Sequence, residues 1–186
     1  MPAFFLALIT CFVAATGGRD QRLVAYLSHT LGASRGLLAA AWIACAATAA
    51  IAALAGEGMA VLLPPAAKTM LVALALLLGA AELAWPFKPR EPAEPTRSLF
   101  AATIVIASRQ IGDAARFLIV AFAASTGSHW LAGIGGALGG GAALTLGWAV
   151  GAELPARLPL RAIRLGIAAV LFLAAVWTGL VARGIL

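Results

Sequence analysis

The chain has 186 residues, of which 63% are hydrophobic and 11% charged, with a net charge of +6 and a mean hydropathy of +1.01. Soluble domains are about 45–50% apolar and about 25% charged, so a water-soluble fold of this length is excluded. The basic residues form no continuous run, which argues against nucleic acid as a partner. We expect an integral membrane protein whose partner and solvent is the lipid bilayer.

Six hydrophobic segments follow one another, and about 20 apolar residues suffice for one span. They cover residues 2–30, 34–63, 66–87, 98–126, 130–154 and 161–180, the first interrupted at 17–22 and the fourth at 110–116. Residues 88–97 are charged and proline-rich, as in a water-exposed linker. The pattern predicts an all-α membrane protein with a three-helix repeat in 1–87, a linker in 88–97 and a second repeat in 98–186.

The two interruptions are similar in sequence and in position. Residues 16–22 read TGGRDQR and residues 110–116 read QIGDAAR, with Gly17 and Gly112 separated by 95 positions. At the same offset Pro64 falls on Pro159. Because each half contains an odd number of spans, the second half enters the membrane from the opposite side. The six predicted spans therefore form two inverted-topology repeats, as in many transporters.

The basic residues predict the orientation of the spans. With the N-terminus outside, seven basic residues lie on the cytoplasmic side and two on the other. The seven are Arg35, Lys88, Arg90, Arg97, Arg157, Arg161 and Arg164, and the two are Lys68 and Arg183. We expect a bacterial inner membrane protein with both termini on the non-cytoplasmic side.

The fifth segment is rich in glycine, with G-x-x-x-G spacings such as Gly135 to Gly139 and Gly136 to Gly140. Small residues let helix backbones approach closely in lipid, so this pattern favours tight packing against a neighbouring helix. The alternative is that the glycines let this helix slide during transport.

The two polar interruptions supply the candidate site. Ionisable groups at membrane depth cost about 2.5–3.5 kcal/mol each on insertion scales, so they are rare without a task. The candidate ion or substrate residues are Thr16, Gly17, Arg19, Asp20, Gln21, Gln110, Gly112 and Asp113, and the candidate metal ligands are Asp113, Gln110 and Asp20. The alternative is that the aspartates form inert pairs with neighbouring arginines, or that the arginines extend to the headgroups.

The residues from Phe12 to Leu23 resemble the pattern F-x-x-E-φ-G-D-[KR]-[ST]-Q-x-L, and those from Gln110 to Leu118 resemble a second copy. This pattern marks the Golgi-type manganese/calcium–proton exchangers and their bacterial relatives, in the lysine-exporter superfamily. The resemblance implies two three-helix halves, a charged linker and a glycine-rich fifth helix. It also implies that Mn²⁺ or Ca²⁺ is carried in exchange for protons at the motif carboxylates, as cargo rather than as a cofactor.

The chain departs from this pattern at most of the acidic positions. Ala15 and Gly18 stand at the first motif's Glu and Asp, and Gln110 stands at the second motif's Glu. Asp113 keeps the second Asp, and Asp20 takes a hydroxyl position. With Arg19, Arg22, Arg109 and Arg116, the two elements sum to +2. If those arginines face the cavity, they repel a dehydrated divalent cation.

Three functions follow from these observations. The first is a small cation/proton antiporter, and the second is an exporter of an anionic or zwitterionic metabolite held by Arg19 and Arg109. The third is a non-transporting membrane scaffold or complex subunit. An enzyme is not expected, because His29 and His129 are isolated and no nucleophile constellation occurs. A shared ion site requires Asp20 and Asp113 to face one cavity.

Overall fold

The computed structural model describes residues 1–86, 98–151 and 159–185, and it contains helices and no strand within these ranges. The helices are α1 (Pro2–Ala15), α2 (Arg19–Leu31), α3 (Arg35–Leu62), α4 (Pro65–Ala84), α5 (Leu99–Gln110), α6 (Ala114–Thr126), α7 (His129–Val150) and α9 (Leu160–Ala182). The predicted all-α class is confirmed. The predicted linker at 88–97, including Lys88, Arg90 and Arg97, lies outside the described residues, as does Arg157.

The helices are those of an integral membrane protein. Four of them, α3, α4, α7 and α9, are long and apolar enough to cross a bilayer, and α1 with α2 adds a fifth span if the bent pair is counted as one. Large apolar side chains such as Ile51, Val61 and Leu173 are well exposed, which suits a lipid surface. The pair α5 and α6 consists of shorter apolar helices. Six spans therefore remain a prediction.

Each predicted interruption is a short break between two helices. Thr16 takes an extended conformation and Gly17 a left-handed one, with φ of 69°, so α1 ends at Ala15 and α2 begins at Arg19 with a 62° bend. The second break is Ile111–Asp113, where the Asp113 carboxylate caps α6 by accepting from the Arg116 N–H at 2.9 Å. The breaks are shorter than the predicted 17–22 and 110–116, because residues 19–22 form the first turn of α2 and residues 114–116 that of α6.

The apolar interior forms two clusters. One gathers side chains of α1, α4, α6 and α9 with parts of α3 and α7, and includes Cys11, Leu118 and Ile119. The other gathers α2 and α5 with other parts of α3 and α7, and includes Val24 and Ile106. Each broken segment thus passes from one cluster to the other at its break. The polar residues of the breaks lie at the boundary between two apolar regions.

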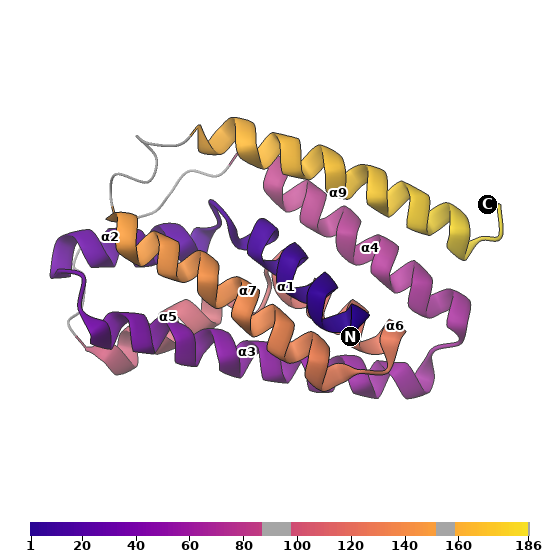
Figure 1. Cartoon of the computed structure of the whole chain (residues 1–186), viewed down its shortest axis with the longest axis horizontal. Helices are drawn as coiled ribbons and strands as arrows, with labels where there is room; N and C mark the ends of the chain where they lie inside the picture. Colours follow the sequence, from indigo (N-terminus) through magenta and orange to yellow (C-terminus); the bar gives the residue numbers. More distant parts are fainter. Residues whose placement is uncertain (87–97, 152–158, 186) are drawn as a thin grey trace.

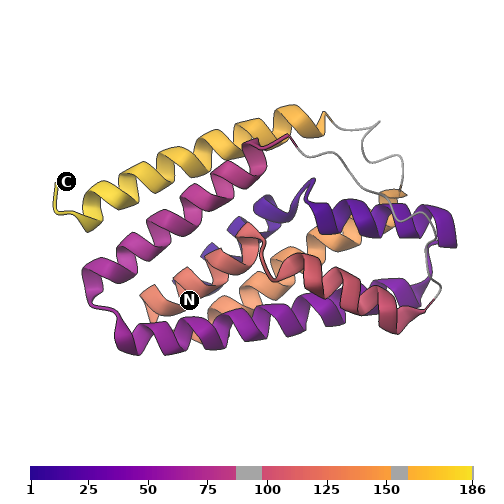
Figure 2. The same cartoon turned by 180° about the vertical axis from the view of Figure 1, so that it is seen from behind.

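The two halves of the chain interlock. Helices α1 and α2 pack on α7 of the second half, while α5 and α6 pack on α3 of the first half. Helix α4 pairs with α9 along one edge of the bundle, and α4 also contacts α6 (Figures 1 and 2). In Figure 1, α1 and α2 run from right to left, whereas α5 and α6 run from left to right.

The glycines of α7 permit very close contact with other helices. A Cβ on Gly139 would lie 3.0 Å from the carbonyl carbon of Leu8, and one on Gly135 would lie 3.0 Å from that of Phe4. On another side of α7, a Cβ on Gly147 would lie 2.7 Å from the carbonyl oxygen of Gln21. The prediction that these glycines serve tight packing is confirmed.

Substitution of Gly139 by alanine is expected to destabilise the protein by about 1–3 kcal/mol, because the added methyl meets α1 backbone that cannot turn aside. Gly58→Ala is the matched control in α3, where a Cβ meets nothing within 4 Å. The measurement is the midpoint of thermal unfolding of both purified variants in one detergent. Equal midpoints for the two variants would contradict the close approach of α1 and α7.

Candidate functional site

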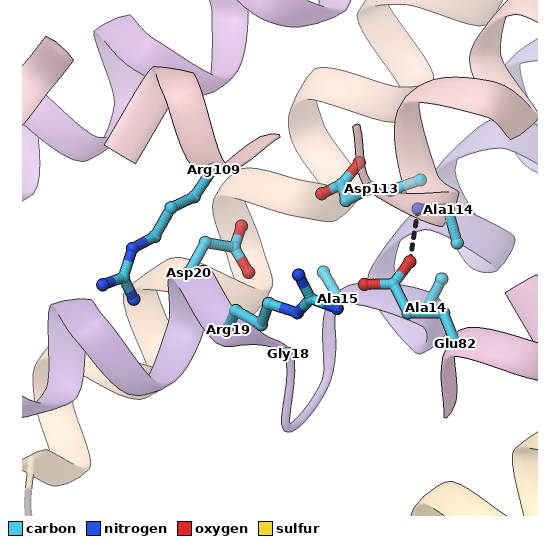
Figure 3. Close-up of a pocket in the computed structure, with 10 residues that line it drawn as sticks. Ala14, Ala15, Gly18, Arg19, Asp20, Glu82, Arg109, Asp113 and Ala114 are labelled. Atoms are coloured by element: carbon cyan, nitrogen blue, oxygen red, sulfur yellow. Dashed lines mark hydrogen bonds between the residues drawn. The ribbon is translucent and has the colours of Figure 1, made fainter. Parts of the chain in front are cut away.

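A pocket opens where the two breaks meet, and residues of both halves line it. From the first half come Ala14, Ala15, Gly18, Arg19, Asp20 and Glu82, and from the second half Arg109, Asp113, Ala114 and Ala115. Asp20 and Asp113, which the sequence analysis required to face one cavity, both line it (Figure 3). The pocket is thus built from the ends of α1 and α4, the starts of α2 and α6 and the last turn of α5.

A buried hydrogen bond joins the two predicted elements directly. The side-chain amide of Gln110 donates to Asp20 Oδ2 at 3.1 Å, across 90 positions of sequence. Gln110 is fully buried and Asp20 is 5% exposed. Asp20 Oδ1 also accepts from the backbone N–H of Gln21 at 2.9 Å. Since a buried carboxylate without partners is very costly, this bond fixes the relation of the two breaks.

Behind the pocket, the Arg116 guanidinium is held in a cluster of polar groups. Its Nη2 donates to Gln110 Oε1 at 2.6 Å and to Thr48 Oγ1 at 2.8 Å, and its Nε donates to Thr48 Oγ1 at 3.0 Å. The Thr48 hydroxyl in turn donates to Gln110 Oε1 at 2.9 Å. On its other side Arg116 Nη1 lies 3.8 Å from Asp113 Oδ2. One of the arginine–aspartate pairs considered from the sequence is therefore present.

Glu82, at the end of α4, completes the acidic wall of the pocket. Its Oε2 accepts from the backbone N–H of Ala114 at 2.7 Å, at the N-terminus of α6 (Figure 3). That position stabilises a carboxylate, because the first N–H groups of a helix have no partner within the helix. Glu82 is not among the site residues predicted from the sequence. Its signal was a lone carboxylate inside a predicted span, residues 66–87, in which Lys68 is the only other charged residue.

The backbone of the first break is satisfied by side chains from both halves. The Gly17 N–H donates to Gln21 Oε1 at 2.6 Å, and the Gln21 amide donates to the Ala143 carbonyl oxygen of α7 at 2.6 Å. The Gly17 carbonyl oxygen accepts from Arg164 Nη1 at 2.6 Å. Arg164 also donates to the carbonyl oxygens of Leu83 at 3.3 Å and Glu82 at 2.9 Å. In the sequence, Arg164 is one of the basic residues that predict the orientation of the spans. In the structure it is 5% exposed, and its guanidinium group bonds to backbone carbonyl oxygens.

The other predicted site residues lie around the pocket rather than in it. Thr16, Gly17, Gln21, Gln110 and Gly112 are not among its lining residues. Thr16 Oγ1 donates back to the Phe12 carbonyl oxygen at 2.8 Å. Gly112 has an ordinary φ, and a Cβ there would meet nothing within 4 Å, so this glycine is not required by the backbone. The two glycines that mark the repeat in sequence are thus unequal in structure.

The charges around the pocket differ from the sum over the two elements. Two arginines, Arg19 and Arg109, line it, while Arg22 and Arg116 do not. With Glu82 added, three carboxylates and two guanidinium groups line the pocket, so the positive sum over the two elements does not extend to the pocket lining. In Figure 3 the Arg19 side chain extends toward Glu82, whereas Arg109 extends past Asp20 to the other side.

The described residues contain no ready-made metal cluster. No group of three or more His, Cys, Asp or Glu side chains in the described ranges is close enough to hold a metal ion.

A helical membrane bundle in which two broken helices meet at a buried polar pocket has the architecture that secondary transporters use to hold ions or small solutes. Residues 98–184, the second half of the chain, match the family model of the divalent cation/proton antiporter GDT1. A search of curated proteins and a search of solved structures give no significant match. The second half is thus similar to antiporters of divalent cations, in agreement with the resemblance of residues 110–118. For the first half the resemblance remains a prediction.

Gly17→Ala is expected to destabilise the protein by about 1–2 kcal/mol, because alanine resists the left-handed conformation of this position. Gly112→Ala, the equivalent change in the other half, is expected to stay within about 0.5 kcal/mol of the wild type. Thermal unfolding midpoints of the two variants, measured side by side, check this asymmetry. A larger loss for Gly112→Ala would contradict it.

Proposed function

We propose that the protein is a secondary transporter that exchanges a divalent cation, with Mn²⁺ or Ca²⁺ as its cargo, for protons. The observation that carries the proposal is the single pocket to which opposite halves contribute Asp20 and Asp113. The match of residues 98–184 to divalent cation/proton antiporters supports the chemistry of the cargo. On this proposal Asp20, Asp113 and Glu82 supply the anionic oxygens, and the Gln110 amide positions Asp20.

Glu82 reduces the electrostatic objection to cation transport. A hard divalent cation needs several oxygen ligands, preferably anionic, and the eroded motifs supply only Asp113 and the displaced Asp20. Glu82 adds a third carboxylate from α4, outside either motif. Carboxylates of the pocket also provide groups that can take up protons when the cation leaves, which exchange requires.

The arrangement of the helices supports six spans in two inverted repeats. The segments α1–α2 and α5–α6 run in opposite directions in Figure 1, and each packs on the helix that follows the other. The N-terminus and the C-terminus lie toward the same end of the bundle, as an even number of spans requires (Figure 1). The orientation with both termini outside, in a bacterial inner membrane, is part of this proposal.

Alternating access follows from rocking of the two halves about the breaks. Cargo enters from one side while Asp20 and Asp113 face it, and the halves then close that side and open the other. The Gln110–Asp20 bond lies between the halves, so it is the contact around which they reorient.

The test is flux of Mn²⁺ and Ca²⁺ into proteoliposomes under an imposed pH gradient, with internal pH recorded in parallel. Asp113→Asn, Asp20→Asn and Glu82→Gln are each expected to reduce cation flux at least about tenfold, because each removes a charge that faces the ion in a low dielectric. Glu57→Gln is the matched control, because Glu57 is an exposed carboxylate outside the pocket that pairs with His129.

Two results would contradict the proposal. One is an absence of flux for every divalent cation in folded wild-type protein. The other is flux that Asp113→Asn and Glu57→Gln reduce equally. Flux of cations without a change of internal pH would keep cation transport and refute the exchange for protons.

A second candidate is export of an anionic or zwitterionic metabolite, which the presence of Arg19 and Arg109 in the pocket lining favours. The two guanidinium groups would bind a carboxylate or phosphate of the cargo. On this candidate, transport depends on an anion and is lost in Arg19→Ala or Arg109→Ala, while Asp113→Asn retains it. The same proteoliposomes, loaded with a panel of labelled organic anions and amino acids, distinguish the two candidates.

A further inference from the structure

Arg116 is the most deeply enclosed charge beside the pocket. It is 4% exposed, and its Nη1 is one of two buried side-chain atoms in the described residues that have no hydrogen-bond partner. A buried N–H group without a partner is costly, so its surroundings require an explanation. Neither the sequence motif nor the family match assigns a function to this residue.

The nitrogens of the guanidinium group differ in their hydrogen bonding. Neutral oxygens of Thr48 and Gln110 hold Nε and Nη2 at 2.6–3.0 Å. Nη1 instead faces Asp113 Oδ2 at 3.8 Å, which is too long for a hydrogen bond. Neutral groups therefore anchor Arg116, and its free N–H is directed at a pocket carboxylate.

The two carboxylate oxygens of Asp113 also have different partners. Its Oδ1 accepts a hydrogen bond from the backbone N–H of Arg116 at the start of α6. Its Oδ2 faces Arg116 Nη1, and the Asp113 side chain is 15% exposed where it lines the pocket. Asp113 Oδ2 is thus within reach of the Arg116 guanidinium and also of any cation that enters the pocket.

We propose that Arg116 is a tethered cation that competes with the transported ion for the carboxylate of Asp113. This inference rests on the proposed cation transport and adds a residue that sets its affinity. With an ion in the pocket, Oδ2 binds the ion and the guanidinium is held by Thr48 and Gln110. With the pocket empty, Nη1 closes on Oδ2, so the buried carboxylate is not left without a counter-charge.

Competition of this kind weakens binding of the ion, because the ion must displace the Arg116 guanidinium from Asp113. It also allows the empty site to return across the membrane neutralised at Asp113 without a proton on that residue.

The test measures Mn²⁺ affinity of purified full-length protein by calorimetry, with Mn²⁺-dependent thermal stabilisation as a second readout. Arg116→Gln is expected to tighten Mn²⁺ binding on the order of tenfold, because it removes a positive charge close to the site. Arg116→Lys retains the charge and is expected to keep wild-type affinity within about threefold.

A second variant guards against loss of folding in Arg116→Gln. Thr48→Val nearly conserves volume and removes a neutral oxygen that holds Nε and Nη2, so it directs the guanidinium toward Asp113. It is expected to weaken Mn²⁺ binding severalfold. A merely structural role of Arg116 predicts the same direction for Thr48→Val and Arg116→Gln, whereas competition predicts opposite directions.

The outcomes separate this inference from the proposed function. Mn²⁺ binding by the wild type that Asp113→Asn abolishes and Arg116→Gln does not tighten overturns the role of Arg116 alone. If Arg116→Gln does not fold, unchanged or tighter binding by Thr48→Val overturns that role. Binding by Arg116→Gln but not by the wild type supports it, and binding by none of the folded proteins overturns both proposals.

Discussion

The structure depends on one constraint: the backbone groups exposed at two helix breaks must find partners where water is scarce. A continuous helix satisfies its own N–H and C=O groups, and an interrupted one does not. Here the groups of Gly17 bond to the side chains of Gln21 and Arg164, and the N–H of Ala114 bonds to Glu82. Each of these side chains is thereby held beside the pocket. The same hydrogen bonds therefore satisfy the broken backbone and position the residues of the site.

Close helix packing makes these repairs possible. The Gln21 amide reaches the Ala143 carbonyl oxygen because the glycines of α7 let α1 and α2 approach its backbone. The same approach lets the chain cross between two apolar clusters at each break, so that the polar groups are enclosed on both sides. Glycine packing and the polar site are therefore linked parts of one arrangement.

Much of the fold could be predicted from the sequence. Hydrophobic length gave the helix bounds to within a few residues, and the matched elements near Gly17 and Gly112 located both breaks. The sequence indicated that a shared ion site requires Asp20 and Asp113 to face one cavity, and both line the same pocket. These features are local or periodic, so they can be read from composition and spacing.

The remaining parts of the site are contacts between residues that are distant in sequence. Glu82 and Arg164 belong to no motif, and their importance comes from the position of α4 and α9 beside the breaks. Thr48 belongs to no motif, but it contacts Arg116 across 68 positions. The difference between Gly17 and Gly112 is a difference of backbone angle, which identical residues cannot reveal.

Glu82 is linked to both breaks, directly to the second and through Arg164 to the first, and this has a mechanical consequence. Its carboxylate bonds to the start of α6, and its carbonyl oxygen shares Arg164 with the carbonyl oxygen of Gly17. Withdrawal of the end of α4 would therefore leave polar backbone unsatisfied in both halves at once. The end of α4 therefore couples the two breaks of the chain through Glu82 and Arg164.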